Sequence, residues 1–128
     1  MSQSDHRKVI YLAGGFKSGW QNKVMTQLPS YDFLDPSLHN IQDAAEYTRW
    51  DLDAIRASDI VFGYMESTNP GGYSLALEIG FAHALGKAVL FVDEIKDPSV
   101  SRYFEMVRQC SDNVFTTLSE AIEYLRKN

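Results

Sequence analysis

Short apolar runs alternate along the chain with segments in which apolar residues recur at helical spacing. The runs are rich in β-branched and aromatic residues, which is typical of buried parallel strands. They predict strands at residues 8–13, 31–34, 59–64, 88–92 and 114–115. The helical spacing predicts helices at residues 20–27, from a cap at Asn40 or Asp43 to about 57, from about 75 to 85, and from Thr117 or Ser119 to about 126. Over residues 101–108 the pattern fits either a short helix or an irregular loop.

Strand and helix alternate throughout, which predicts right-handed βαβ units. The expected fold is an α/β sandwich of the flavodoxin-like or Rossmann-like kind. It has a five-stranded parallel sheet in the order 2-1-3-4-5 with helices on both faces. At 128 residues the chain is expected to form one domain over residues 1–128, with residues 1–7 disordered. The loops after the first, third and fourth strands then meet at the carboxyl edge of the sheet, where such folds bind ligands.

Composition and charge narrow the function classes. The chain is 45% hydrophobic and 23% charged, which is ordinary for a globular protein, and its formal net charge of −5 argues against a nucleic-acid partner. No signal peptide or membrane span is evident, and the lone Cys110 cannot form an internal disulfide. No Cys/His cluster has zinc-ligand spacing, and we expect no metal and no cofactor. We therefore expect a cytoplasmic protein that has no membrane partner.

The stretch from Asn69 to Gly86 carries the strongest local signal. Pro70 followed by Gly71 and Gly72 predicts a turn. The helix after it would offer unpaired backbone N–H groups to a phosphate or sugar oxygen. Glu78 lies one turn into this helix among apolar neighbours. A carboxylate in that setting is either solvent-facing or held by partners and used in chemistry.

The predicted topology brings three chemically useful groups toward one crevice: Tyr11, Asp51 and Glu78. Two carboxylates and a tyrosine hydroxyl form a workable set for cleaving a glycosidic bond. One carboxylate would attack or stabilise the anomeric carbon, and the other would handle the proton of the leaving base. The tyrosine would hold the nucleophile by a hydrogen bond. Two alternatives stay open: Asp51 as a solvent-exposed partner of Arg49 or Arg56, and Tyr11 as a core residue.

The loops that converge on this crevice also predict a substrate-binding surface. They are residues 14–19, 66–74 and 93–102. Phe16 and Trp20 offer flat apolar surface for a base to stack on, although tryptophan more often serves in packing. We expect substrate contacts from Gly14, Gly15, Phe16, Lys17, Ser18, Trp20, Asn69, Gly71, Gly72 and Ser74. His39 lies in a loop where it could touch a ligand, and His83 is interpreted as structural.

Several segments are informative through their order and spacing: residues 10–16, 21–23, 51–55, 58–60, 77–82, 86–87 and 111–114. Together they span most of the chain and resemble the nucleoside 2-deoxyribosyltransferase family. The resemblance implies a retaining mechanism. Glu78 would form a covalent deoxyribosyl intermediate, Asp51 would manage the proton of the departing base, and Tyr11 would orient the nucleophile. It also implies Phe16 as the aromatic of the first loop, and a homo-oligomer in which a neighbouring subunit's Met106 completes each site.

Two local features of the resemblance bear on the reaction. Gly72 stands where the transferases carry a second aspartate, and Lys17-Ser18-Gly19 is similar to the phosphate-gripping first loop of hydrolytic relatives. The leading prediction is transfer of the deoxyribosyl group of a nucleoside to another free base. The alternative is hydrolysis of (deoxy)nucleoside 5′-monophosphates to free base and sugar 5-phosphate. A non-catalytic nucleotide sensor is less favoured. So is a flavodoxin-type redox protein, because the first loop lacks a Ser/Thr-rich phosphate cradle.

Overall fold

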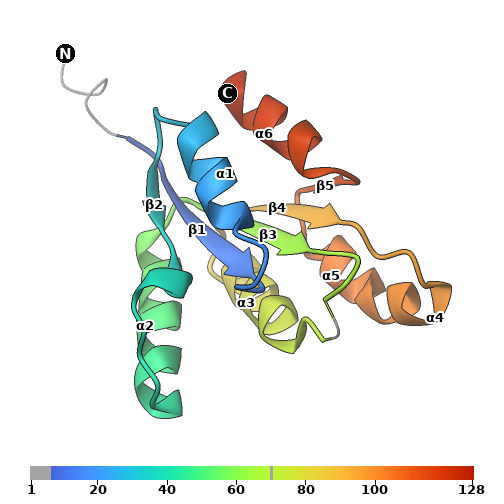
Figure 1. Ribbon diagram of the computed structural model, residues 1–128, viewed down its shortest axis with the longest axis horizontal. Helices are drawn as coiled ribbons and strands as arrows, with labels where there is room; N and C mark the ends of the chain where they lie inside the picture. The colour runs from blue at the N-terminus through green and yellow to red at the C-terminus, as the bar shows by residue number, and fades with distance from the viewer. Residues whose placement is uncertain (1–6, 70) are drawn as a thin grey trace.

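Five parallel strands form the central sheet of the computed structural model, which describes residues 7–69 and 71–128 (Figure 1). The strands are β1 (Val9–Gly14), β2 (Asp32–Leu34), β3 (Ile60–Met65), β4 (Ala88–Asp93) and β5 (Asn113–Phe115). Their order across the sheet is β2-β1-β3-β4-β5, and every neighbouring pair is parallel. The predicted fold class and strand order are therefore confirmed.

Helices cover both faces of this sheet. They are α1 (Trp20–Gln27), α2 (Ala44–Ala57), α3 (Tyr73–Ala84), α4 (Pro98–Ser101), α5 (Glu105–Gln109) and α6 (Leu118–Arg126), with 3-10 turns η2 (Pro36–Leu38) and η3 (Arg102–Phe104). Helices α1 and α6 lie over one face, and α2, α3 and α5 lie over the other (Figure 1). The buried side chains of each group form a separate core cluster with the sheet. Within the described residues, no helix is long and apolar enough to cross a bilayer.

Alternation along β1 decides which side chain reaches the carboxyl-edge crevice. Ile10 and Leu12 join the core cluster formed with α1 and α6, whereas Tyr11 and Ala13 join the cluster formed with α2, α3 and α5. All four side chains are fully buried. Successive side chains of a strand point to opposite faces of the sheet. The hydroxyl of Tyr11 is therefore directed toward the helices of the second cluster, which include α3.

The entry to α3 depends on a glycine. Gly72 precedes the helix with a φ of 79°, in the left-handed region that favours glycine. A Cβ atom at this position would lie 2.7 Å from Met65 Sδ and 3.0 Å from Phe104 Cζ, so a larger residue would have to displace these side chains. The turn predicted at this entry includes Pro70, which lies outside the described residues.

The segment that the sequence leaves open between helix and loop is helical. Residues 101–108 divide between α4, η3 and α5. Arg108 holds this segment against the end of β4, because its guanidinium donates to Asp93 Oδ2 over 2.5 Å and to the Ser101 carbonyl over 2.8 Å. A partly buried arginine with two such acceptors is a strong local tie. The helix predicted at residues 20–27 is observed with the same bounds, as α1.

Arg7 is anchored where disorder is predicted. Its guanidinium donates to Asp32 Oδ1 and to the backbone carbonyls of Pro29 and Tyr31. Because one guanidinium carries several N–H donors, it can hold all three oxygens together. These bonds tie the start of β1 to the segment that enters β2. The disorder predicted for residues 1–7 is therefore wrong for Arg7, and residues 1–6 lie outside the described part of the chain.

Candidate active site

Tyr11 and Glu78 form a buried pair between β1 and α3. The Tyr11 hydroxyl donates a hydrogen bond to Glu78 Oε2 over 2.6 Å. Leu75, three residues before Glu78, packs into the core beneath α3, so that Glu78 is carried on the same side of the helix. Only 8% of Glu78 is exposed. The solvent-facing alternative for Glu78 is therefore wrong, and its carboxylate is held by a partner.

Burial makes Glu78 difficult to ionise. Its removal from water raises the pKa of the Glu78 carboxyl to about 7, with the Tyr11 hydrogen bond opposing the rise and the charge of Asp51 adding to it. Burial and the neighbouring carboxylates raise the pKa of Tyr11 far above its usual range. The tyrosine hydroxyl therefore keeps its proton and acts as a donor to Glu78. A carboxyl that titrates near neutral pH is typical of functional sites.

Asp51 lies on α2 and faces the same space. Its Oδ1 is 3.1 Å from His39 Nε2, and the side chains of His39 and Asp51 are 12% and 19% exposed. Burial raises the pKa of the Asp51 carboxyl, and the contact with His39 opposes that rise. Arg56 pairs with Asp53 instead, at 2.6 Å. The interpretation of Asp51 as the solvent-exposed partner of that arginine is therefore wrong.

A cavity of about 300 Å³ brings the two carboxyls together. Glu78 reaches it from α3 and Asp51 from α2, while Tyr11 supports Glu78 from the sheet. The volume lies at the lower end of the range for small-ligand pockets. In the described part of the chain, no three His, Cys, Asp or Glu side chains are grouped so as to hold a metal ion. The lining residues are Gly14, Phe16, Pro36, His39, Ile41, Tyr47, Asp51, Ser74, Leu75 and Glu78.

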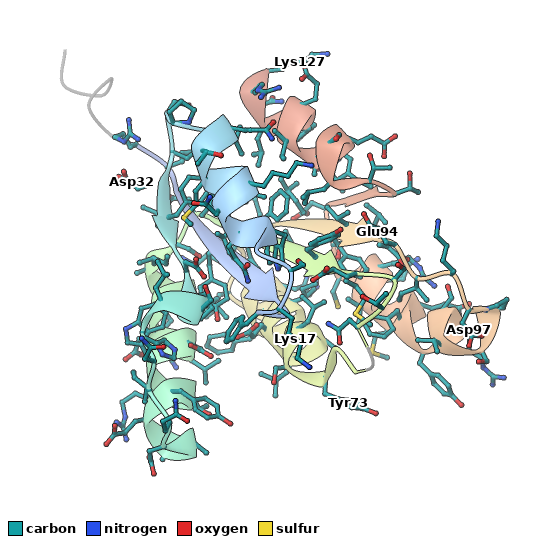
Figure 2. The ribbon with its side chains drawn as sticks, in the orientation of Figure 1. Lys17, Asp32, Tyr73, Glu94, Asp97 and Lys127 are labelled. Carbon is teal, nitrogen blue, oxygen red and sulfur yellow. The ribbon has the colours of Figure 1, made fainter. Side chains whose placement is uncertain are left out.

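Most of the other predicted substrate residues line two further depressions. One, of about 560 Å³, shares Phe16 with the cavity and is lined by Gly15, Phe16, Lys17, Ser18, Glu66, Thr68 and Asn69. The other, of about 520 Å³, is lined by Gly71, Gly72, Tyr73, Ala76, Val100, Tyr103 and Phe104. Lys17 and Tyr73 are exposed at this edge of the molecule (Figure 2). Met106 is 78% exposed on α5.

Trp20 cannot stack on a base, so that prediction is wrong. Its side chain is 3% exposed and packs against Phe62 and Tyr64, with ring centroids 5.9 Å and 5.2 Å away. The indole N–H donates to the Gly15 carbonyl over 2.8 Å. The physical reason is the left-handed turn at Gly19, where φ is 78°, immediately before α1. After this turn the first side chain of the helix points into the core formed with α6.

Sequence reasoning noted that His39 could touch a ligand, but it missed the other residues that the segment after β2 contributes. This segment and the start of α2 supply Pro36, His39, Ile41 and Tyr47 to the cavity. Asp35 begins the η2 turn by accepting hydrogen bonds from the backbone N–H and the hydroxyl of Ser37. The chain leaving that turn brings His39 beside Asp51. The strand order could have predicted this contribution. Because β2 lies next to β1, the segment that follows β2 starts at the same edge of the sheet.

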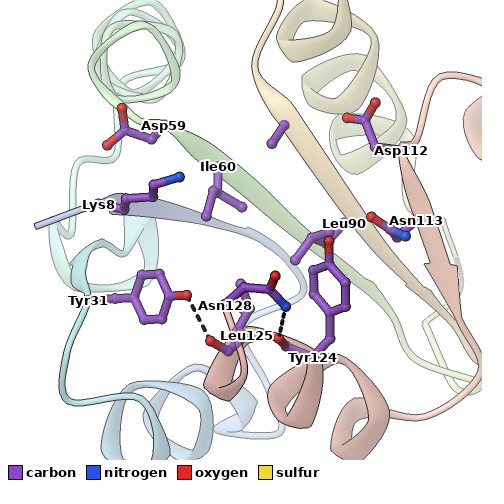
Figure 3. A pocket seen from close by; sticks show the side chains of 11 residues that line it. Lys8, Tyr31, Asp59, Ile60, Leu90, Asp112, Asn113, Tyr124, Leu125 and Asn128 are labelled. Carbon is purple, nitrogen blue, oxygen red and sulfur yellow. Dashed lines mark hydrogen bonds between the residues drawn. The ribbon is translucent and has the colours of Figure 1, made fainter.

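A cavity with similar residue types lies at the opposite, amino edge of the sheet (Figure 3). It measures about 290 Å³. Here the carboxylates bind the backbone: Asp59 Oδ2 accepts from the N–H of Val9 over 2.8 Å, and Asp112 Oδ2 accepts from the N–H of Val89 over 2.7 Å. The Tyr31 hydroxyl donates to a backbone carbonyl of α6 over 2.8 Å. These bonds tie strand starts and α6 together, so we interpret this cavity as structural.

Comparison with known proteins supports the same region. The family model described as "Nucleoside 2-deoxyribosyltransferase like" matches residues 7–95, a stretch that includes Tyr11, Asp51 and Glu78. A structure of a 2-desoxiribosyltransferase from Leishmania mexicana aligns with a TM-score of 0.74 at 24% identity, covering 94% of this chain and 98% of that one. The CMP N-glycosidase BcmB from Clostridium botulinum aligns with a TM-score of 0.65 at 18% identity, covering 94% and 100%. Curated protein sequences give no match. At these identities the two structures establish a shared fold.

Proposed function

This chain belongs to the nucleoside 2-deoxyribosyltransferase-like family, and from that membership we propose that it cleaves the N-glycosidic bond of (deoxy)nucleosides with Glu78 as the nucleophile. The family indicates an enzyme of the deoxyribosyltransferase or N-glycosidase type. The observation that carries the proposal is the buried Tyr11–Glu78 hydrogen bond beside a cavity that Asp51 also lines. A nucleophile, the group that orients it and a second carboxyl are thus gathered around one small space.

Glu78 acts in its ionised form. The Tyr11 hydroxyl occupies Oε2, which leaves Oε1 to attack C1′ of the sugar. The C1′–N bond breaks as the new C1′–O bond forms, and the electron pair of the broken bond leaves with the base. The intermediate is a glycosyl ester of Glu78 with inverted configuration at C1′. A second displacement at C1′ frees Glu78 and restores the original configuration.

Asp51 protonates the departing base. Burial raises the pKa of both carboxyls, and the charge of Asp51 also raises that of Glu78. Two neighbouring carboxyls affect each other's ionisation and titrate as a pair. The Tyr11 hydrogen bond favours the ionised form of Glu78, which leaves Asp51 as the carboxyl that brings a proton to the leaving base.

The second displacement decides the reaction class. Attack on C1′ by a nitrogen of another free base transfers the deoxyribosyl group, whereas attack by water hydrolyses the ester. Transfer needs a surface that holds the acceptor base and excludes water. Phe16 is 56% exposed and lines the cavity, so it can serve as that surface by stacking on a base. We place transfer from nucleosides first.

Hydrolysis of (deoxy)nucleoside 5′-monophosphates is the second candidate. Lys17 and Ser18 line the depression that shares Phe16 with the catalytic cavity. An ammonium group and a hydroxyl at that place suit the 5′-phosphate of a nucleotide whose sugar lies over Glu78. Glu66 lines the same depression and offsets part of the positive charge. The balance between Lys17 and Glu66 therefore bears on whether phosphate is accepted.

The proposal includes a homo-oligomer. Tyr103 and Met106 are 74% and 78% exposed, and exposed apolar side chains near a site suit contact with a second subunit. Met106 of a neighbouring subunit then completes the site. Analytical ultracentrifugation at the assay concentration measures the oligomeric state. A fully active monomer would contradict this part of the proposal.

A substrate panel tests the reaction directly. Deoxynucleosides, nucleosides and their 5′-monophosphates are incubated with and without a second free base and separated by chromatography. A new nucleoside demonstrates transfer, and free base with free sugar demonstrates hydrolysis. Sugar 5-phosphate formed from the monophosphates supports the second candidate. Tight nucleotide binding without turnover of any compound would contradict both and favour a non-catalytic sensor.

A further inference from the structure

His39 is held on both of its ring nitrogens. Nδ1 accepts a hydrogen bond from the backbone N–H of Ile41 over 3.0 Å, and Nε2 lies 3.1 Å from Asp51 Oδ1. The ring also packs edge-on against Trp50, with centroids 4.6 Å apart. Its side chain is 12% exposed. The imidazole therefore has little freedom to turn over or to exchange partners.

These contacts fix which nitrogen carries the proton. A backbone N–H can only donate, so Nδ1 must present a lone pair to Ile41. The proton of the neutral ring then sits on Nε2 and points at Asp51 Oδ1. A doubly protonated ring would direct its Nδ1–H at the N–H of Ile41. The arrangement thus suits an imidazole that donates from Nε2 to Asp51.

We propose that His39 is a positioning residue for the reaction at Asp51: its Nε2–H occupies Oδ1, so that the transferable proton of Asp51 is carried on Oδ2. This inference rests on the proposed function. In the first step the Oδ2 proton passes to the leaving base nitrogen as the C1′–N bond breaks and the bond to Glu78 forms. In the second step the attacking base or water returns a proton to Oδ2. His39 keeps its own proton throughout.

The groups around Asp51 are consistent with this assignment. Glu78 faces it from α3 and Tyr47 from its own helix, with His39 approaching from the segment after η2. Tyr11 already donates to Glu78. Among these neighbours, the imidazole is the one bonded to Asp51. Without a donor on Oδ1, the proton of Asp51 could reside on either oxygen, so that His39 determines which oxygen carries it.

Three substitutions of His39 separate positioning from packing. His39→Phe keeps an aromatic ring against Trp50 but removes the donor, His39→Ala removes both, and His39→Gln keeps an N–H donor. We expect His39→Phe and His39→Ala to lower kcat by about 10- to 100-fold with KM little changed, because only part of the effect of a general acid is lost. His39→Gln should recover most of kcat. Equal loss in all three variants would overturn the proposal, provided their thermal unfolding matches the original chain.

The dependence of the rate on the leaving base separates proton delivery from packing, because a residue that only packs would affect all substrates equally. A deoxynucleoside with an N7-methylated purine or a 5-nitropyrimidine has a base that departs with little or no protonation. For such a compound, His39→Phe should retain at least about half the original rate, whereas the loss for an ordinary base should persist. A loss of the same size for both kinds of base would overturn the role in proton delivery.

The tautomer can be measured even if no substrate turns over. The chain has three histidines, and long-range ¹H–¹⁵N spectra, assigned with His39→Gln, report the protonation of each ring nitrogen. At pH 7.5 we expect His39 to show a protonated Nε2 and an unprotonated Nδ1. A ring protonated on Nδ1, or on both nitrogens, would overturn the assignment. Failure of the whole substrate panel would instead refute the proposed function, so the two failures are distinguishable.

Discussion

Both edges of the sheet carry aspartate and tyrosine side chains, but these side chains have different hydrogen-bond partners at each edge. At the carboxyl edge, Glu78 accepts a hydrogen bond from a tyrosine and Asp51 is bonded to an imidazole. At the amino edge, Asp59 and Asp112 each accept a backbone N–H, and Tyr31 donates to a backbone carbonyl. The two cavities measure about 300 Å³ and 290 Å³. Their volumes are nearly the same, and both are lined by aspartate and tyrosine side chains.

The difference lies in what the polar groups bind. A carboxylate that accepts a backbone N–H satisfies a donor at the start of a strand and so contributes to folding. Burial of the carboxyls at the other edge raises the pKa of both Glu78 and Asp51, and the side chains bonded to them oppose that rise. Burying an ionisable carboxyl lowers the stability of the folded chain, so the presence of two such carboxyls indicates a role other than folding. Variants at the two edges should therefore fail in different ways.

Replacing Glu78 by glutamine should have the largest effect. Glutamine keeps the size of the side chain and an acceptor for Tyr11, but it cannot form the glycosyl ester. We expect the turnover rate to fall by at least about 10³-fold, with substrate binding little changed. Glu123→Gln is the matched control, because Glu123 is an exposed partner of Arg126 on α6. Steady-state kinetics of both variants measure the contrast, and a Glu78→Gln variant with more than a tenth of the original rate would exclude Glu78 as nucleophile.

The free energy of unfolding should depend on pH through the same residue. The pKa of Glu78 is about 7 in the folded chain against an ordinary 4.5, so between these values the folded state retains a proton that the unfolded state has released. The resulting stabilisation is complete below about pH 4.5 and is lost as the pH rises to about 7. At pH 8, Glu78→Gln should therefore be more stable than the original chain by roughly 3 kcal/mol. Urea denaturation at pH 5 and pH 8 measures this, and an equal difference at both pH values would count against it.

Tyr11→Phe should have a smaller effect, visible in the pH profile. The tyrosine hydrogen bond lowers the pKa of Glu78, so its loss should move the rising limb of kcat/KM to higher pH. At pH 6.5 we expect kcat/KM to fall by about tenfold, which corresponds to a shift of about one pH unit. Tyr31→Phe, at the amino edge, should leave the profile in place. A shift of the limb toward lower pH in Tyr11→Phe would contradict the role given to its hydroxyl.

Asp112→Ala should have the smallest effect on the reaction and should act on stability instead. It leaves the backbone N–H of Val89 without its acceptor, which should lower the unfolding free energy by about 1–3 kcal/mol. The turnover rate of the folded fraction should stay unchanged. Chemical denaturation and kinetics on the same sample test both statements. Loss of turnover with unchanged stability would mean that the amino edge also carries function.

Much of the fold follows from periodicity. Nearly continuous apolar runs identify buried parallel strands, and the alternation with helices leads to the observed strand order. The same topology predicts that Tyr11 and Glu78 approach each other although they are 67 residues apart. These inferences succeed because they depend on repeating patterns and on a sheet topology that has few alternatives.

The remainder of the site depends on single turns, which periodicity does not describe. The left-handed turn at Gly19 points Trp20 into the core. The direction of this turn cannot be predicted from hydrophobic periodicity. The η2 turn is three residues long, and it determines where His39 lies. The direction taken by a short turn depends on contacts such as those of Asp35 with Ser37, which are evident only in the folded chain.

The central claim is that Glu78 forms a covalent bond to the sugar, and trapping that bond tests it most directly. A 2′-fluoro-2′-deoxynucleoside slows both displacements, because fluorine at C2′ disfavours positive charge at C1′, and the intermediate accumulates where the second step is slowed more. Intact-protein and peptide mass spectrometry then measure the adduct. The account predicts the added mass of one fluorodeoxyribosyl group on the peptide that contains Glu78, and its release on addition of a free base. An adduct on another residue, or turnover of the natural substrate with no trappable adduct, would contradict it.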